Sequence, residues 1–263
     1  NTGGTATLLI TCASIISNTS SGDGAGVYNH FGGSQLSIEN SLISFNTIVG
    51  GGSGTGAGLY NRSQATLSNS SITYNQTTNS AGGIANVFGG VMSIINGCDI
   101  SYNQSNNEGG GISQSGTASS LIISSATITN NIATGVARGG GIYNDNGFLS
   151  ITASTISNNT GRIGGVFHIQ NTVGSNLNIT NSTISTNTGG NLGGAIYLEG
   201  TAVLVNLNHV TIANNTSPNF GAISNPNNGR VNLQNSIIGN KITYTNILCF
   251  ITNEIKTKGI LIT

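Results

Sequence analysis

The chain has 263 residues, only 5% of them are charged, and its formal net charge is zero. Nucleic acids and anionic lipids are bound largely through clustered Lys and Arg side chains, so this composition excludes an electrostatic site of that kind. Hydrophobic residues make up 36% of the chain and 40 residues are glycine, which is typical of a folded protein with many tight turns.

The three cysteines, Cys12, Cys98 and Cys249, lie far apart and form neither a metal-binding spacing nor a disulfide framework. We therefore expect no metal and no other cofactor. No apolar run approaches the ~18 residues that a transmembrane helix needs, so no membrane span is expected. The chain opens directly on repeat sequence at Leu8-Leu9-Ile10 without a signal peptide, as an excised or mature segment of a longer protein would.

A repeat of about 28 residues runs through most of the chain. Its clearest copy, residues 139–159, begins with a glycine run and ends with Thr155-Ile156-Ser157-Asn158-Asn159. Repeats of this size are typical of stacked architectures, in which one unit cannot bury its apolar face alone. The final Asn recurs at intervals of 28 or 29 residues, at Asn18, Asn46, Asn75, Asn103, Asn131, Asn159, Asn187 and Asn215.

Each repeat contains three segments with the character of short strands. An alternating apolar segment such as Leu149/Ile151 comes first, and another Ile follows five residues later. In the fourth copy this gap is six and contains Asn96-Gly97, which predicts a bulge or a lengthened turn. The third segment is the aliphatic residue that closes the glycine run, at Val27, Leu59, Ile84, Ile112, Ile142, Val166, Ile196 and Ile223. Only the stretch between the Asn and this residue varies in length, which predicts a surface loop.

Three short strands are too few for a free-standing sheet, and no helical periodicity is present. If each strand pairs with its counterpart in the next repeat, the backbone N–H and C=O groups are hydrogen-bonded and the apolar residues line up in a core. We therefore predict an all-β, right-handed parallel β-helix over residues 1–240, with eight to nine coils of ~28 residues and three short strands per coil. Residues 241–263 lack the glycine box and are predicted to form a C-terminal tail, with two alternatives: a cap on the last coil, or the beginning of a neighbouring segment.

The glycine box reads GGGI at residues 109–112 and 139–142 and GGAI at 193–196, and it is accompanied by an IxxN box such as residues 156–159. These boxes resemble the GGA[ILV] and FxxN motifs of chlamydial polymorphic outer-membrane proteins and related bacterial β-helix repeat proteins. The resemblance covers about residues 8–240, with Ile in place of the family's Phe. It implies a secreted or cell-surface bacterial protein with an adhesive or structural role, and it supplies no catalytic residue.

If the coils stack, the repeated Asn residues named above form a column. Stacked amide side chains can hydrogen-bond one another and the turn backbone, so we interpret this column as a structural Asn ladder. A second, partial column follows the aliphatic residue of the glycine box by two positions. Its members are Asn29, Asn61, Asn86, Asn144 and Asn225.

Aromatic residues often follow the aliphatic residue of the glycine box, as at Tyr28 and Tyr60. If the aliphatic residue points inward, the ring beside it points outward. Tyr143, Phe167 and Tyr197 fall on consecutive coils and are therefore candidate ligand-binding residues, as a platform for sugar rings or a partner protein. The alternative is that the rings stack on one another or under the variable loop.

Ionisable residues are scarce, and acid–base catalysis needs several of them in one place. Their main gathering lies between residues 138 and 199, with Arg138 and Arg162 in successive loops. Asp145 and Glu199 share a column two coils apart, with His168 beside it, so these three are the candidate catalytic residues of a polysaccharide lyase or hydrolase. The two carboxylates would be roughly 10 Å apart, at or beyond the upper end for an inverting glycosidase. The other acidic residues of the repeats stand alone in their columns: Asp23, Glu39, Asp99 and Glu108.

Hydroxyl side chains flank the Ile of the second predicted strand in several coils. Such rows resemble the ice-binding face of some antifreeze proteins, although exposed parallel strands commonly carry Thr and Ser in any case. Leu42 and Asp99 interrupt the rows. The pairs are Ser71/Thr73, Thr127/Thr129, Thr155/Ser157, Thr183/Ser185 and Thr211/Ala213.

The sequence therefore predicts a non-catalytic extracellular or cell-surface rod that acts as a scaffold or adhesin. Its expected partners are a glycan or a surface protein, and not nucleic acid. An uncapped first coil also predicts end-to-end self-association. A polysaccharide-active enzyme and an ice-binding module are the alternatives.

Overall fold

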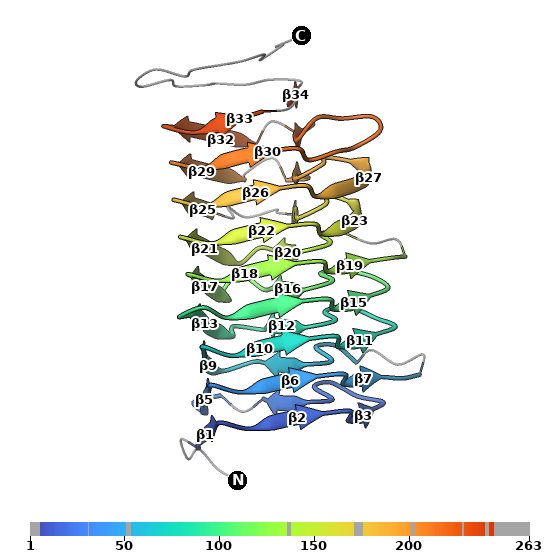
Figure 1. Ribbon diagram of the computed structural model, residues 1–263, viewed down its shortest axis with the longest axis vertical. Coiled ribbons are helices and arrows are strands. Elements are labelled where there is room, and N and C mark those ends of the chain that lie inside the picture. Colours follow the sequence, from blue (N-terminus) through green and yellow to red (C-terminus); the bar gives the residue numbers. More distant parts are fainter. Residues whose placement is uncertain are drawn as a thin grey trace.

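The computed structural model describes residues 6–30, 32–50, 54–135, 138–170, 176–200, 203–227, 229–239 and 242–244. Within these residues the chain forms a parallel β-solenoid of about 8 turns and contains no helix. Strands on the near side of Figure 1 run to the right while the chain climbs from the N-terminal to the C-terminal end, so the winding is right-handed. The predicted fold class is confirmed.

Sheet A is formed by the alternating apolar segments. In its parallel register Leu149 pairs with Leu177 and Ile151 with Ile179, as the repeat predicts. Its strands are β1 (Thr7–Thr11), β5 (Gln35–Glu39), β9 (Gln64–Ser68), β13 (Val91–Ile95), β17 (Ser120–Ser124), β21 (Phe148–Thr152), β25 (Asn176–Thr180), β29 (Leu204–Asn208) and β32 (Arg230–Gln234).

Sheet B follows after a sharp turn in each coil. Ile128, Ile156 and Ile184 pair directly with one another and are fully buried. In the fourth copy the extra residue lengthens the turn between sheets A and B, where both Asn96 and Gly97 have positive φ. The strands of sheet B are β2 (Ser14–Ile16), β6 (Leu42–Ser44), β10 (Ser71–Thr73), β14 (Asp99–Ser101), β18 (Thr127–Thr129), β22 (Thr155–Ser157), β26 (Thr183–Ser185), β30 (Thr211–Ala213) and β33 (Ile237–Ile238).

Sheet D contains the strands that follow the glycine boxes. From Val27 to Ile223, the first residues of these strands are buried in one apolar core along the axis. The strands are β4 (Val27–Asn29), β8 (Leu59–Asn61), β12 (Ile84–Val87), β16 (Ile112–Ser115), β20 (Ile142–Asp145), β24 (Phe167–Gln170), β28 (Ile196–Leu198), β31 (Ile223–Asn225) and β34 (Ile242–Tyr244). Since β34 pairs with β31, sheet D extends past residue 240, and the rest of the tail lies outside the described residues.

A further set of very short strands, sheet C, lies within the stretch predicted as a loop. Most of these strands have two residues, too few for a visible alternation in the sequence. Sheet C and the loops after it run along one edge of the solenoid, at the right of Figure 1. The strands are β3 (Thr19–Ser20), β7 (Thr47–Ile48), β11 (Gln76–Thr77), β15 (Gln104–Ser105), β19 (Ile132–Ala133), β23 (Thr160–Ile163) and β27 (Thr188–Leu192).

The predicted inward position of Val166 is wrong by one residue. Phe167 pairs with Ile142 and Ile196, and its side chain is fully buried. The reason is that the boxes GGVF (164–167) and GGAI (193–196) both begin with a glycine of positive φ, Gly164 and Gly193. Aligned on their glycines, GGVF and GGAI place Val166 opposite Ala195, so Phe167 takes the inward position.

The glycine boxes pack directly against the Asn column. A β-carbon added at Gly111 would lie 2.7 Å from the Gly141 carbonyl oxygen and 3.0 Å from the side chain of Asn131. At Gly83 the same atom would lie 2.5 Å from the Gly111 carbonyl oxygen and 3.1 Å from the side chain of Asn103. Only glycine fits at these two positions, so in these coils the two sequence motifs are two halves of one contact, whereas Val166 and Ala195 take the equivalent position in later coils.

Candidate functional site

The repeated Asn residues form an unbroken hydrogen-bonded ladder, which we call ladder one. Nδ2 of Asn131 donates to Oδ1 of Asn159 at 3.0 Å and to the Ile100 carbonyl oxygen at 2.8 Å. The same Oδ1 also accepts the backbone N–H of Asn131. From Asn46 to Asn187 these side chains are fully buried. Their polar groups satisfy one another and the turns, which leaves them unable to contact a ligand.

The second amide column, ladder two, is shorter than the first. It runs Asn29–Asn61–Asn86–Gln114–Asn144, with hydrogen bonds of 2.7, 2.8, 3.1 and 3.0 Å in that order. Gln114 supplies the amide in the coil where the sequence has no Asn at this position. In the next two coils Ile169 and Leu198 take the position, because the sequence supplies no amide there. Asn225, predicted as a further member, is buried beyond this break with its Oδ1 unpaired.

The predicted aromatic platform of Tyr143, Phe167 and Tyr197 is not formed. Phe167 points into the core, as described above, and only 4% of Tyr143 is exposed. In the register of sheet D, His168 pairs with Tyr143 on one side and with Tyr197 on the other, so His168 takes the place between them that was predicted for Phe167. At the other end of this column the rings of Tyr28 and Tyr60 stack on each other, with centroids 5.1 Å apart.

A different aromatic stack, which the sequence analysis missed, lies at the corner between sheets B and C. Phe45, Tyr74 and Tyr102 each precede an Asn of ladder one and each has positive φ. Their ring centroids are 5.0 and 4.8 Å apart, and the rings are parallel within 8°. About half of each residue is exposed. Because the rings cover one another's faces, they present mainly their edges to solvent.

The hydroxyl rows of sheet B are regular in the later coils. Thr127, Thr155 and Thr183 pair in register and their side chains are exposed. In the earlier coils Leu42 and Asp99 stand in the same row. The flat hydroxyl surface is therefore confined to the coils of β18, β22 and β26, with Thr211 of β30 half-buried beside them.

A groove lies along the loop edge of the solenoid and consists of two adjoining cavities. The first, the loop cavity, has a volume of about 610 Å³ and is lined by the ends of sheet C and the loops around them. The polar side chains that line it come from successive coils: Asn79, Asn107, Glu108, Arg138, Arg162 and Asn191.

The second, the sheet cavity, has a volume of about 400 Å³ and lies over the outward face of sheet D. Ala85 and Ser113 form its floor because their side chains are small, whereas Tyr60 and Tyr143 take the equivalent positions on the strands to either side. Phe88 and three carboxylates complete the lining. The two cavities share Ser80 and Glu108, so they form one groove.

The three carboxylates of the sheet cavity are Asp23, Glu108 and Asp145. The repeat pattern gives Asp23 and Glu108 no partner, because both lie in the stretch of variable length, where counting residues does not align one coil with the next. Oδ1 of Asp23 accepts the backbone N–H of Thr55 at 2.8 Å. Oε2 of Glu108 accepts a hydrogen bond from the Ser80 hydroxyl at 3.2 Å.

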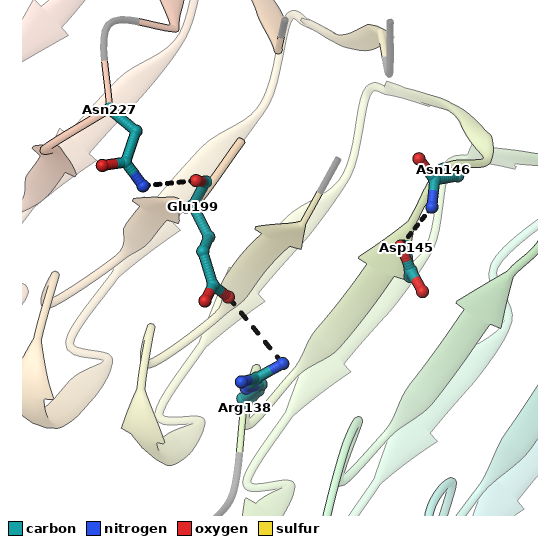
Figure 2. A network of polar contacts seen from close by, with 5 residues as sticks. All are labelled: Arg138, Asp145, Asn146, Glu199 and Asn227. Atoms are coloured by element: carbon teal, nitrogen blue, oxygen red, sulfur yellow. Dashed lines mark hydrogen bonds and ion pairs between the residues drawn. The ribbon is translucent and has the colours of Figure 1, made fainter. Parts of the chain in front are cut away.

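Two of the three candidate catalytic residues, Asp145 and Glu199, interact with Arg138. Nη1 of Arg138 lies 3.8 Å from Oε2 of Glu199, with both side chains about one-third exposed, and Asp145 accepts a hydrogen bond from Asn146 (Figure 2). Burial raises the pKa of Asp145, the charge of Glu199 acts in the same direction, and Arg138 opposes them. The structure therefore brings Asp145 and Glu199 to the same arginine. The side chain of His168 lies outside the described part of the chain.

The protein is therefore a parallel β-solenoid with polar cavities along one edge. Comparison with protein-family models, with curated proteins and with solved structures finds no match. Within the described residues, no three His, Cys, Asp or Glu side chains are grouped to hold a metal ion. The same residues contain no helix that is long and apolar enough to cross a membrane.

Proposed function

We propose that the protein is a non-catalytic rod on the surface of a bacterial cell or outside it, where it serves as a scaffold or adhesin and binds a glycan or a surface protein in the groove. The groove is the observation that carries this proposal. The two amide ladders are buried within the wall of the solenoid, whereas the loop cavity and the sheet cavity open to solvent. The resemblance of the repeats to bacterial surface proteins supports the location.

Binding is favoured over catalysis by the way the acidic groups of the groove are held. Asp23 accepts from Thr55, Glu108 from Ser80, and Asp145 from Asn146. Glu199 faces Arg138. A general acid and base must exchange protons with a substrate, and fixed acceptors of this kind serve better to orient hydroxyl or amide groups.

A glycan array combined with turnover assays on neutral and acidic polysaccharides tests the proposal. We expect binding without cleavage. Ser113→Tyr should abolish this binding, because a ring at that position fills the sheet cavity between Tyr60 and Tyr143. Ser150→Tyr, on the outward face of sheet A, is the matched control and should bind normally. Cleavage by the wild-type protein would support the polysaccharide-active enzyme instead.

The ice-binding alternative is supported by one observation, the exposed row of Thr127, Thr155 and Thr183 in register on sheet B. Thermal hysteresis measured on the wild-type protein and on Thr155→Tyr tests it. A hysteresis that is lost in this variant would favour an ice-binding module. End-to-end self-association stays a prediction, and electron microscopy at high protein concentration tests it.

A further inference from the structure

Positive charge is concentrated at one place in the groove. The basic side chains of the described residues are those of Arg62, Arg138, Arg162 and Arg230. Two of them, Arg138 and Arg162, line the loop cavity. With 5% charged residues in the whole chain, two arginines in one cavity are a clear departure from the rest of the surface.

The fold brings these two arginines together through an irregularity in sheet C. Arg138 forms a parallel bridge with Ile163, so Arg162 lies on the next coil beside it. Strands β23 and β27 have four and five residues in place of the usual two, and their register shifts between Gly161 and Ile163. The lengthened strands form the wall of the loop cavity where Arg162 is placed.

Arg162 is oriented by its neighbour on the following coil. With the Asn191 amide turned so that its oxygen faces Arg162, this oxygen accepts from Nε of Arg162 at 3.1 Å. The Asn191 nitrogen then donates to the Gly190 carbonyl oxygen at 3.0 Å. Arginine has five N–H donors, so a bond through Nε holds the side chain while its terminal amino groups remain able to bind a ligand.

The two cavities carry opposite charge. The loop cavity is lined by two arginines and Glu108, which gives a formal charge of +1 (2 − 1). The sheet cavity is lined by Asp23, Asp145 and the same Glu108, with no arginine or lysine, which gives −3 when the shared Glu108 is counted in both cavities. An anionic group on a ligand is therefore attracted toward Arg162 and repelled from Asp145. Arg138 lies between these two and is partly neutralised by Glu199 at 3.8 Å.

The neutral side chains of the loop cavity suit a carbohydrate. Nδ2 of Asn107 donates to Oδ1 of Asn79 at 2.9 Å, which fixes the direction of both amides. Asn191 supplies a third amide at the far end. One polar side chain per coil over four coil steps gives a row roughly 19 Å long, so a chain of several sugar residues can lie along it.

We propose that the loop cavity binds an anionic carbohydrate, with Arg138 and Arg162 contacting its carboxylate or sulfate groups and the amides contacting its hydroxyls. Guanidinium groups pair with such oxyanions through two parallel hydrogen bonds, which is why arginine is suited to this role. The inference rests on the proposed function and deepens it by naming the class of glycan.

Three oligosaccharides of equal length test the inference by calorimetric titration: an oligogalacturonate, a sulfated dextran oligomer and a neutral dextran oligomer. We expect the wild-type protein to prefer one of the two anionic chains, and the preferred chain identifies the group. Arg162→Gln should weaken this binding about tenfold or more, because charge-assisted hydrogen bonds are lost. Arg162→Lys should bind with intermediate affinity, and higher salt should weaken binding to the wild-type protein.

Arg230→Gln is the control, since Arg230 is an exposed arginine on sheet A, away from the loop cavity. It should bind like the wild-type protein. Equal binding of the neutral and anionic oligomers, unchanged in Arg162→Gln, would overturn the inference and leave the proposed binding function standing. A wild-type protein that ignores both anionic oligomers while binding other glycans on the array would also overturn it. If the wild-type protein binds no glycan on the array, the result counts against the proposed function itself.

Discussion

Ladder one and ladder two are built from the same kind of side chain, yet only the first spans the solenoid. In ladder one each amide from Asn46 to Asn187 is fully buried and bonds to the coil on either side. Ladder two ends at Asn144, and apolar side chains replace the amide in the next two coils.

The difference follows from which residues the sequence supplies at the two positions. Ladder one comes a fixed distance after the strands of sheets A and B, and every coil delivers an Asn to the same place. Ladder two lies two residues after the first residue of each strand of sheet D, and it stays in register from Asn29 to Asn144 although the loops before it differ in length. It ends where the sequence supplies Ile169 and Leu198 at that position instead of an amide.

The same substitution inside ladder one and at a buried Asn outside both ladders should have very different effects. Asn131→Leu removes the acceptor for the backbone N–H and Nδ2 of Asn103 and the donor to the Ile100 carbonyl oxygen. Each buried group left unpaired costs about 1–3 kcal/mol, so we expect the free energy of unfolding to fall by about 3 kcal/mol or more. Urea denaturation followed by circular dichroism measures the change.

Asn225→Leu is the matched control. Its Oδ1 already lacks a partner, its Nδ2 makes one bond to the Gly229 carbonyl oxygen, and its neighbour in the column is Leu198. We expect a change within about 1 kcal/mol, because an apolar side chain removes an unpaired polar atom at the cost of one hydrogen bond. Equal losses in the two variants would show that position in a ladder does not decide the effect.

A smaller effect is expected at the aromatic stack beside ladder one. Tyr74→Ala removes ring contacts with Phe45 and Tyr102, each worth about 0.5–1.5 kcal/mol, and leaves a side chain at φ +56°. Tyr74→Gly loses the same contacts but relieves the left-handed backbone by about 1 kcal/mol. Thermal denaturation should therefore rank the wild-type protein first, Tyr74→Gly second and Tyr74→Ala third.

Asn158→Gly gives the reference for the backbone alone, since Asn158 takes the same position at φ +55° without a ring. It should leave the melting temperature unchanged or slightly raised. A Tyr74→Gly variant no more stable than Tyr74→Ala would show that the backbone at this corner is not strained.

The smallest expected effect is at the end of ladder two, where Asp145 follows Asn144. Because burial raises the pKa of Asp145 in the folded protein, its contribution to stability is present below the ordinary pKa and is lost as the pH rises through the raised value. The stability of the wild-type protein relative to Asp145→Asn should therefore fall by a fraction of a kcal/mol between about pH 3 and pH 6. Urea midpoints at several pH values measure it, with Asp99→Asn as the control for general charge effects.

The sequence was sufficient wherever the repeat has constant length. The strands of sheets A and B, the core columns through Ile156 and the amides of ladder one follow directly from the 28-residue period, whereas the strands of sheet D are marked by the glycine boxes that precede them. The partners of Asp23, Glu108 and Phe167 could not be found by counting, since all three lie within or just after the variable stretch. Aligning the boxes on their glycines would have placed Phe167 correctly.

The groove was predicted only in part. Arg138, Asp145 and Glu199 were expected near one another, and they are. The loop cavity was not expected, because its wall depends on the longer strands β23 and β27, whose sequences TGRI and TGGNL show no apolar alternation. The stack of Phe45, Tyr74 and Tyr102 was within reach of the sequence, since each aromatic residue immediately precedes a ladder Asn, but left-handed positions are usually occupied by Gly or Asn.

The contact between each bare glycine backbone and the amide of the neighbouring coil has a practical consequence. Both halves of this contact are present in the copies that contain Gly83 and Gly111, and each coil touches only the coils before and after it. A single unit such as residues 103–130 is therefore a self-complementary building block. Tandem copies of it should lengthen the rod by one coil spacing each, without any newly designed interface.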